Sequence, residues 1–461
     1  MSTQPKGLPG FLRRSLRIAE EEVAEISDAA PPTNDSVFNE GATNIGRSYF
    51  EFSVGKPPLP ESRTPTGTPM ATPAPTPSVS KPTRHDLLDF PSLALEQDPD
   101  PEPSVELKAT LTKADFDIKP AKTYKDRQLD AVLFSDIVNM TDLRTLCWNG
   151  IPPRHRAQAW KILLGYLPTN NARRTQTLAR KRAEYKDAIL QHYDIDDDVR
   201  TVQEQETLRQ VLVDVPRTAP EVGLFRNDRI RKALSRLLFV WAMRHPASSY
   251  VQGINDLATP LIVVFLANYF QESSMDDILN GSVMNQVTEE MMEEVEADCY
   301  WCLTNLLAGI QDHYTSDQPG VQRMVMRLEE LVTRIDADLT SYLKRVGIEF
   351  MQFSFKWMNC LLLREFNPKC VQRLWDTYIS EGDGGFSNFH VYVCAAFLCQ
   401  FSTQLQSMEF DELFGFMQRL PTDDWGDTEI EILLSQAFVL STLFADSDAH
   451  LAGSRRQMEL T

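Results

Sequence analysis

From about Tyr124 onward, apolar residues recur every three or four positions, and this spacing is what most limits the fold. The segment "NDRIRKALSRLLFVWAMRH" (227–245) opens with Asn227 and Asp228, residue types that commonly cap helix N-termini. Its apolar residues share one face when the segment is drawn as an α-helix, so the spacing predicts an amphipathic helix. These residues are Ile230, Ala233, Leu234, Leu237, Leu238 and Trp241.

The same period recurs along the chain, and no segment alternates apolar and polar residues as a half-buried strand would. We therefore expect an all-α fold. The acidic, methionine-bearing segment 272–299 is expected to be an exposed loop that leads into the next helix. "LIVVFLANYF" (261–270) predicts a buried helix, because it has about half of the roughly 18–20 apolar residues of a membrane span. The other helical segments are 155–166, 320–347, 351–365 and 388–402.

Residues 1–120 differ in composition, since almost half of the 28 prolines lie between Pro57 and Pro103, where large apolar residues are sparse. Such a segment cannot bury enough surface to offset its chain entropy, so we predict a disordered region. Within it, residues 11–26 have helical spacing and predict a short amphipathic helix. This helix could dock on a partner, rest on a membrane surface or have no function of its own. Residues 448–461 are expected to form a short flexible tail.

Four threonines in the proline-rich stretch "TPTGTPMATPAPTP" each precede a proline and recur four residues apart. An extended, polyproline-like spacer explains this pattern. A cluster of sites for proline-directed kinases explains it equally well, and each phosphate would then add negative charge and strong hydrogen-bond acceptors. The candidate phosphorylation sites are Thr64, Thr68, Thr72 and Thr76.

The net charge of −19 indicates that nucleic acid is not a partner, because such a field repels phosphate backbones. The seven cysteines are an odd number and several lie in apolar runs, which predicts reduced thiols in a soluble, cytosolic protein. Any membrane attachment is then peripheral.

"CYWC" (299–302) has the spacing of a metal or redox pair. It lacks a second pair, so we interpret it as structural and predict no metal site.

Two polar segments stand out against the helical background. In "VLVDVPRTAP" (211–220), Pro216 disfavours helical geometry before it, which leaves Arg217 in a loop where it could project toward a partner. An ordinary surface pair with Asp214 is the simpler alternative. In "YVQGINDLATP" (250–260), Asn255 or Asp256 could cap the following helix, and Gly253 supplies a permissive backbone. Capping does not explain Gln252, because glutamine has no special use there.

Three segments share an order and spacing that is characteristic of one family. They are "GIPPRHRAQAWKILLGYLP" (150–168), "VLVDVPRT" (211–218) and "YVQGIND" (250–256). The second resembles I-x-x-D-x-x-R with Val211 in the isoleucine place, and the third is a full Y-x-Q-G-x-N-D. Together they resemble the signature motifs of the TBC domain, the GTPase-activating fold for Rab/Ypt GTPases. The resemblance covers residues 125–447.

The resemblance implies a large helical TBC domain with two lobes arranged in a V. In this family the arginine of the second motif and the glutamine of the third act in trans on a bound Rab. Carried over, Arg217 is an arginine finger beside the β- and γ-phosphates, and Gln252 orients the attacking water. The partner GTPase carries GTP and Mg²⁺, so no cofactor of the chain's own is expected. The remaining motif residues are expected to be structural, with Asn255 and Asp256 either capping the helix or bracing the segment: Asp214, Tyr250, Gly253, Asn255, Asp256, Arg156 and Trp160.

The resemblance leaves two functions open: a Rab GAP that stimulates GTP hydrolysis, and a non-catalytic TBC scaffold that binds a Rab. The presence of both Arg217 and Gln252 favours catalysis, because degenerate family members lack one of them. A hydrolase has little support, since the histidines form no triad-like pattern and no G-x-S-x-G motif occurs. In detail the chain is most similar to the Golgi-associated Ypt/Rab GAP subgroup, which implies a role in vesicle traffic and a cytoplasmic location, peripheral at Golgi membranes.

Overall fold

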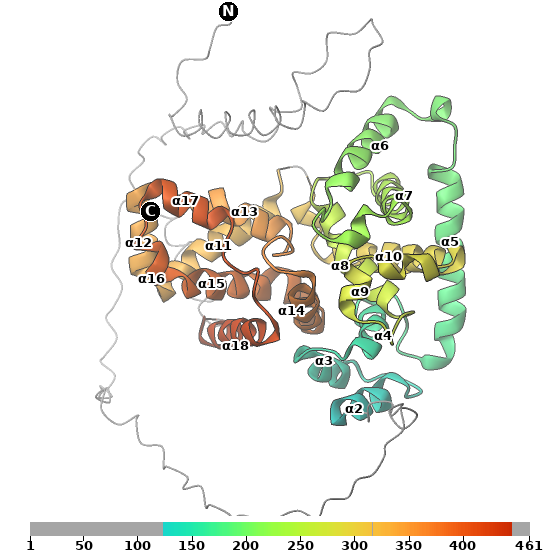
Figure 1. The fold of residues 1–461 in the computed structure, drawn as a ribbon, viewed down its shortest axis with the longest axis horizontal. Coiled ribbons are helices and arrows are strands. Elements are labelled where there is room, and N and C mark those ends of the chain that lie inside the picture. Colours follow the sequence, from blue (N-terminus) through green and yellow to red (C-terminus); the bar gives the residue numbers. More distant parts are fainter. Residues whose placement is uncertain (1–122, 316, 445–461) are drawn as a thin grey trace, which may run out of the picture. The chain divides into compact units, whose positions relative to one another are not determined.

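The computed structural model describes residues 123–315 and 317–444, and their regular structure is helical (Figure 1). These ranges contain no β-strand, so the predicted all-α fold is confirmed. The α-helices are α2 (Tyr124–Leu133), α3 (Met140–Trp148), α4 (Pro153–Leu163), α5 (Arg174–His192), α6 (Val202–Asp214), α7 (Asp228–Arg244), α8 (Ile254–Ala267), α9 (Met275–Leu279), α10 (Glu289–Gly309), α11 (Pro319–Ile335), α12 (Ala337–Val346), α13 (Phe350–Asn359), α14 (Pro368–Glu381), α15 (His390–Gln400), α16 (Ser402–Leu405), α17 (Phe410–Gln418) and α18 (Asp427–Phe444).

Several expectations concern residues outside the described ranges. The predicted disordered region at 1–120, its helix at 11–26, the four candidate phosphorylation sites and the tail at 448–461 all lie there. Those features, like the domain boundaries at 125 and 447, stay predictions. Within the part of the chain that the structure describes, no helix is both long enough and apolar enough to cross a bilayer.

Helix α7 forms where the apolar period predicts it. The side chain of Asn227 caps its N-terminus by accepting a hydrogen bond from the backbone N–H of Arg229 at 3.0 Å. Asp228 lies in the first turn, where a negative charge is favourable next to the helix dipole. The predicted apolar face is buried, so this helix is confirmed from its cap to its core-facing residues.

The prediction of an exposed loop at 272–299 is wrong. Helix α9 and the first half of α10 fall within this segment. The hydroxyl of Thr288 caps α10 by accepting from the backbone N–H of Met291 at 3.1 Å, and Glu289 and Glu290 follow in the first turn. Acidic residues at this end of a helix stabilise it, so the negative charge that suggested a loop instead marks a helix start.

Two carboxylates farther along α10 are buried and paired with residues of other helices. Glu296 accepts hydrogen bonds from the hydroxyl of Tyr185 at 2.7 Å and from Nε of Arg236 at 3.0 Å. Asp298 accepts from Nε of Arg182 at 3.0 Å and also pairs with Lys161. These partners lie 60 or more positions away, so the pattern within α10 alone does not reveal them.

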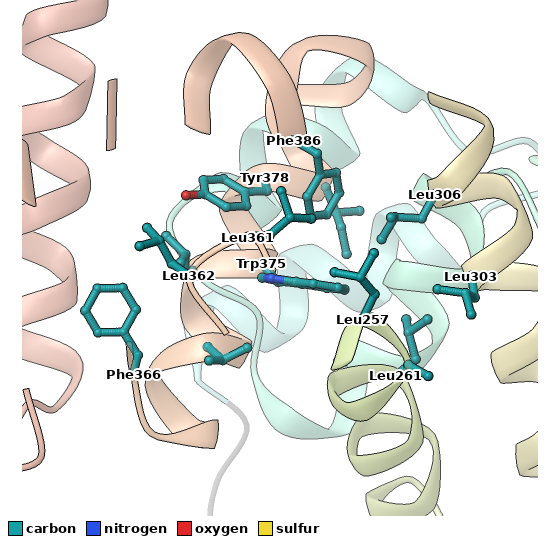
Figure 2. Close-up of a cluster of buried hydrophobic side chains, with 14 of the residues drawn as sticks. Leu257, Leu261, Leu303, Leu306, Leu361, Leu362, Phe366, Trp375, Tyr378 and Phe386 are labelled. Atoms are coloured by element: carbon teal, nitrogen blue, oxygen red, sulfur yellow. The ribbon is translucent and has the colours of Figure 1, made fainter. Parts of the chain in front are cut away.

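The core lies where α8 and α10 meet each other and the C-terminal helices. Figure 2 shows a buried cluster that joins Leu257 and Leu261 of α8, Leu303 and Leu306 of α10, and Trp375 of α14. The predicted buried helix at 261–270 is confirmed over 261–267, which belongs to α8.

Pro260 lies inside α8 rather than ending it. A proline has no backbone N–H, so it leaves the carbonyl of the residue four positions earlier without its helical partner. That carbonyl belongs to Asp256, and the hydroxyl of Thr259 donates to it at 2.8 Å. The neighbouring threonine thus supplies the hydrogen bond that the proline removes.

Helix α13 is shorter than the apolar period at 351–365 predicts. It ends at Asn359, and the chain then turns through Leu361 and Leu362, whose φ angles are +50° and +60°. Both leucines are buried. The apolar residues that extend the helical pattern in the sequence therefore fill the core from a turn.

Candidate functional site

Arg217 ends a short 3₁₀ turn, Val215–Arg217, that follows α6 directly. Pro216 within the turn has no backbone N–H and so prevents α6 from continuing in regular form. The Arg217 side chain is 55% exposed. Its guanidinium donates to one carboxylate oxygen of Asp214, from Nε at 2.9 Å and also from Nη2. The surface pair with Asp214 therefore exists, and it leaves the arginine accessible to solvent.

Asp214, the last residue of α6, connects the arginine turn to the third motif. The residue is buried, and its second carboxylate oxygen accepts a hydrogen bond from the hydroxyl of Tyr250 at 2.8 Å. Its backbone carbonyl accepts from the hydroxyl of Thr218 at 3.0 Å. One carboxylate thus holds both the arginine side chain and the start of segment 250–256.

Asn255 completes the connection. Its side-chain oxygen accepts from the backbone N–H of Gly253 at 3.0 Å and from the hydroxyl of Tyr250 at 3.3 Å. Its amide nitrogen donates to the hydroxyl of Thr218 at 2.9 Å. The Asn255 side chain is buried, so these hydrogen bonds also satisfy polar atoms that water does not reach.

Of the two structural roles expected for Asn255 and Asp256, capping is wrong, and bracing is the role that the contacts support. The residue before the first turn of α8 is Gly253, with φ of +109°, and it has no side chain to cap with. Asn255 and Asp256 lie inside the first turn of the helix. They face inward as braces, because Asn255 meets the arginine turn and Asp256 meets Arg364, whose Nε and Nη2 atoms lie 2.9 and 2.7 Å from its carboxylate.

Gln252 is exposed at the tip of this segment. None of the hydrogen bonds found among the described residues uses its side chain, whereas its backbone carbonyl accepts from the amide of Asn359 at 3.2 Å. The structure thus fixes the Gln252 backbone and leaves its carboxamide in solvent. Capping could not account for this residue in the sequence, and no hydrogen bond or ion pair among the described residues accounts for its side chain either.

Burial controls the protonation of the groups behind Arg217 and Gln252. The pKa of the Tyr250 hydroxyl is raised by burial and by the nearby negative charge of Asp214, so the hydroxyl remains a hydrogen-bond donor at neutral pH. Burial also raises the pKa of Asp256, and the positive charge of Arg364 opposes this rise. Behind the exposed side chains of Arg217 and Gln252 there are thus a neutral hydrogen-bond donor, Tyr250, and the pair of Asp256 with Arg364.

The first motif lies on α4 and contacts α14. Arg156 donates from Nε and Nη2 to the carboxylate of Asp376, with distances of 3.1–3.2 Å, and from Nη1 to Gln372 at 3.0 Å. The indole N–H of Trp160 donates to the same carboxylate at 2.7 Å, as does the backbone N–H of Ile151 at 2.8 Å. Asp376 is fully buried, so Arg156 and Trp160 join two helices instead of lining a surface site.

Sequence reasoning missed several residues of these networks, among them Thr218, Arg364 and Asp376. Asp376 carried a usable signal, because a charged residue within the apolar pattern of "RLWDTY" is buried only with a partner. Arg364 carried no such signal, because it is exposed and only its partner Asp256 is buried. Thr218 gave no such signal, since a threonine after an arginine in a loop is ordinary.

The described residues contain no group of three or more His, Cys, Asp or Glu side chains that could hold a metal ion. Cys299 and Cys302 of the "CYWC" stretch are free thiols buried in α10, and burial raises the pKa of both.

Chemically, the site offers the guanidinium of Arg217 and the carboxamide of Gln252 on two joined segments. The first suits a phosphate, and the second can orient a water molecule or a polar ligand.

The chain matches the family model described as the Rab-GTPase-TBC domain over residues 153–406. It is 48% identical over 325 residues to "GTPase-activating protein gyp1" of Schizosaccharomyces pombe, in a match that covers 70% of the chain and 62% of that protein. It is 43% identical over 353 residues to the human "TBC1 domain family member 22B", with 76% of the chain and 68% of the relative covered. The chain thus spans less than two thirds of the fission yeast protein's length.

Among solved structures, the described fold is similar to the crystal structure of the Ypt/Rab-GAP domain of Gyp1p. The TM-score is 0.66 at 44% sequence identity, and the match covers 69% of the chain and 98% of that structure. The family model covers more than half of the chain and contains Arg217, Gln252 and the residues that join them. The chain belongs to the Rab-GTPase-TBC domain family.

Proposed function

We propose that the chain is a GTPase-activating protein for a Rab/Ypt-family GTPase. The observation that carries this proposal is that Arg217 and Gln252 are both exposed, on segments that buried hydrogen bonds join through Asp214, Tyr250 and Asn255. Family membership supports it, as does the activity named for the fission yeast relative.

In the proposed mechanism, Arg217 enters the nucleotide site of the bound GTPase. Its planar, always-charged guanidinium offsets the negative charge that spreads over the transferred phosphoryl group. Such an arginine contributes about 10³–10⁵ in rate, which corresponds to roughly 4–7 kcal/mol of barrier. Gln252 orients the attacking water through its carboxamide, a role in which a neutral side chain acts by position instead of charge.

GTP and Mg²⁺ belong to the partner in this mechanism, and the chain contributes no cofactor. The residues behind the two functional side chains hold them in register. Asp214 orients Arg217 in the free domain. Tyr250 and Asn255 connect the turn that carries Arg217 (Val215–Arg217, the arginine turn) to residues 250–256 (the glutamine segment).

Single-turnover GTP hydrolysis across a panel of GTP-loaded Rabs tests the proposal. We expect Arg217→Ala and Arg217→Lys to lower the stimulated rate at least a hundredfold, because lysine cannot reproduce the planar fork of the guanidinium. Gln252→Ala should lower it by a smaller factor. The matched control is Arg209→Ala, since Arg209 is an exposed arginine of α6 that is likewise paired with an acid three residues away.

The same panel decides between catalysis and the scaffold alternative. Unchanged hydrolysis in Arg217→Lys would show that the arginine is not a finger. A wild-type domain that binds a GTP-loaded Rab without accelerating hydrolysis would instead support a non-catalytic scaffold. That alternative has one observation in its favour, because Arg217 already has a partner in Asp214 within the free domain.

We also propose that catalysis belongs to the TBC domain at 125–447 and that residues 1–120 direct the protein to its membrane, peripherally at the Golgi from the cytoplasm. The composition of residues 1–120 supports this division, because it cannot supply a packed catalytic surface. Deleting residues 1–120 should leave stimulated hydrolysis in solution nearly unchanged and alter the location of the protein in cells. A large loss of activity in solution would make the N-terminal region part of the catalytic unit.

A further inference from the structure

The turn after α13 is strained and contacts the segment that carries Gln252. Leu361 and Leu362 both have left-handed φ angles, of +50° and +60°, which cost residues other than glycine of the order of 1–3 kcal/mol each. Their burial in the cluster of Figure 2, beside residues such as Leu257 and Trp375, offsets this cost. Two adjacent strained residues persist only where the surroundings hold them, and here they bend the chain toward α8.

Three polar side chains of this turn reach the glutamine segment. The amide of Asn359 donates to the backbone carbonyl of Gln252 at 3.2 Å. The thiol of Cys360 and the guanidinium of Arg364 both contact the carboxylate of Asp256, at 3.5 and 2.9 Å. The turn thus holds both ends of the short stretch from Gln252 to Asp256.

The orientation of the Asn359 amide is itself determined by its neighbours. Its side-chain oxygen accepts a hydrogen bond from Nε2 of Gln318 at 3.0 Å, so its nitrogen is the end that points to Gln252. The same Gln318 nitrogen also donates to the carbonyl of His313 at 2.8 Å. The hydroxyl of Tyr314 donates to the backbone carbonyl of Asn359 at 2.7 Å. Asn359 is largely buried, so water does not replace these bonds readily.

Gly253 lets Asn359 approach this closely. A Cβ atom at position 253 would lie 2.5 Å from the Asn359 amide nitrogen, and φ of +109° is a geometry that other residues rarely adopt. The amide therefore lies directly against the peptide that joins Gln252 to Gly253. The orientation of that peptide sets the direction in which the Gln252 side chain leaves the backbone, and a displacement of about 1 Å can cost about a hundredfold in rate.

We propose that Asn359, oriented by Gln318, is the positioning residue for Gln252. The inference rests on the proposed GAP function and assigns the C-terminal helices a part in it, since both residues lie outside the three signature motifs. Asn359 touches neither nucleotide nor water in this scheme. It acts through the backbone of Gln252 and thereby fixes where the exposed carboxamide can reach.

Two substitutions remove the positioning and keep the number of side-chain heavy atoms. Asn359→Leu removes the donor to the Gln252 carbonyl. Gln318→Glu turns the donor that orients Asn359 into an acceptor, which favours rotation of the Asn359 amide away from its present orientation. The matched control is Ser354→Ala on α13, because Ser354 is buried and its hydroxyl, among residues 123–315 and 317–444, bonds only within its own helix, to the carbonyl of Phe350.

The first readout is single-turnover hydrolysis by the Rab that the wild type stimulates most. We expect Asn359→Leu to lower the maximal rate about tenfold and to leave the half-saturating concentration of the domain within about twofold, because the contact surface is intact. The same substitution made in Gln252→Ala should cause no further loss, as two residues in one pathway are not additive. Equal losses in both backgrounds, or a wild-type rate in Asn359→Leu, would overturn the proposal.

The second readout is hydrogen–deuterium exchange of the backbone amides of residues 250–256, which needs no GTPase. Exchange should accelerate at least tenfold in Asn359→Leu and Gln318→Glu and stay at the wild-type rate in Ser354→Ala. If Asn359→Leu does not fold, Gln318→Glu decides on both readouts. If the wild type stimulates no Rab, the proposed function fails, whereas unchanged exchange in both variants overturns the positioning role itself.

Discussion

The guanidinium of Arg217 donates from both Nε and Nη2 to a single carboxylate oxygen of Asp214, three residues earlier in the chain. The other oxygen is occupied by the hydroxyl of Tyr250, so the aspartate stays in place whether or not the arginine is bound to it. Because 55% of the Arg217 side chain is exposed, solvent screens the pair from that side and weakens it. The pair can therefore orient Arg217 before binding and release it to a phosphate at little cost.

Tyr250→Phe tests whether the Asp214 carboxylate depends on that second hydrogen bond. The substitution removes one buried donor and leaves the ring, so we expect the free energy of unfolding to fall by about 1–2 kcal/mol. The stimulated rate should fall as well, because the arginine turn and the glutamine segment lose their link. Urea unfolding and single-turnover hydrolysis measure the two effects. Stability and rate both equal to the wild type would show that the link is dispensable.

Two Gly→Ala substitutions distinguish two effects of adding a methyl group. One is strain in the folded backbone, and the other is the lower conformational entropy of the unfolded chain. Gly253→Ala should destabilise the domain by about 1–3 kcal/mol and lower stimulated hydrolysis, because φ of +109° and contact with Asn359 both reject a methyl group. Gly415→Ala in α17 should leave the domain unchanged or stabilise it by up to about 1 kcal/mol, as nothing lies within 4 Å of the added atom. Thermal unfolding of both variants gives the comparison, and a Gly253→Ala as stable as Gly415→Ala would contradict it.

Asp376→Ala should cost far more stability than an exposed acid does. It leaves the charge of Arg156 unpaired in a largely buried setting and removes the acceptor of the Trp160 indole, so we expect a loss of about 3–5 kcal/mol. Asp276→Ala is the control, because its pair with Lys369 is exposed and should change stability by less than about 1 kcal/mol. Equal losses in the two variants would mean that Asp376 does not join α4 to α14.

The helical period was sufficient to predict the fold class and helix α7, because an amphipathic face is a local property of the sequence. It failed at 272–299, where charge suggested a loop. The acids of α9 and α10 within that segment either lie in a first turn or, like Glu296, find partners distant in the sequence. It also failed after Asn359, since Leu361 and Leu362 look the same in a helix as in a strained, buried turn.

The residues of the candidate site also divide into those that the sequence predicts and those that it does not. Arg217 and Gln252 could be named from the motifs, and the absence of a structural use for Gln252 was visible in the sequence. For Asn255 and Asp256 the sequence left capping and bracing open, and capping was mistaken, because Gly253 takes the position before the helix. Asn359 could not be named, since its role depends on a contact across 107 positions.

Two buried histidines make the stability of the domain depend on pH below neutrality. Burial lowers the pKa of His313 from 6.5 to about 4 and that of His390 from 6.5 to about 3. The unfolded chain therefore takes up protons between pH 6.5 and pH 4 that the folded domain does not. The resulting stability is present above pH 6.5 and is lost as the pH falls.

His313→Gln isolates one of these contributions, because both proteins share every carboxylate that titrates nearby. The variant should be less stable than the wild type at pH 7, since it loses packing against Gly320. The difference in the free energy of unfolding should then shrink by about 2 kcal/mol between pH 7 and pH 5, as only the wild type has this proton uptake on unfolding. Urea unfolding at the two pH values measures it. A constant difference would mean that His313 titrates alike in the folded and unfolded chains.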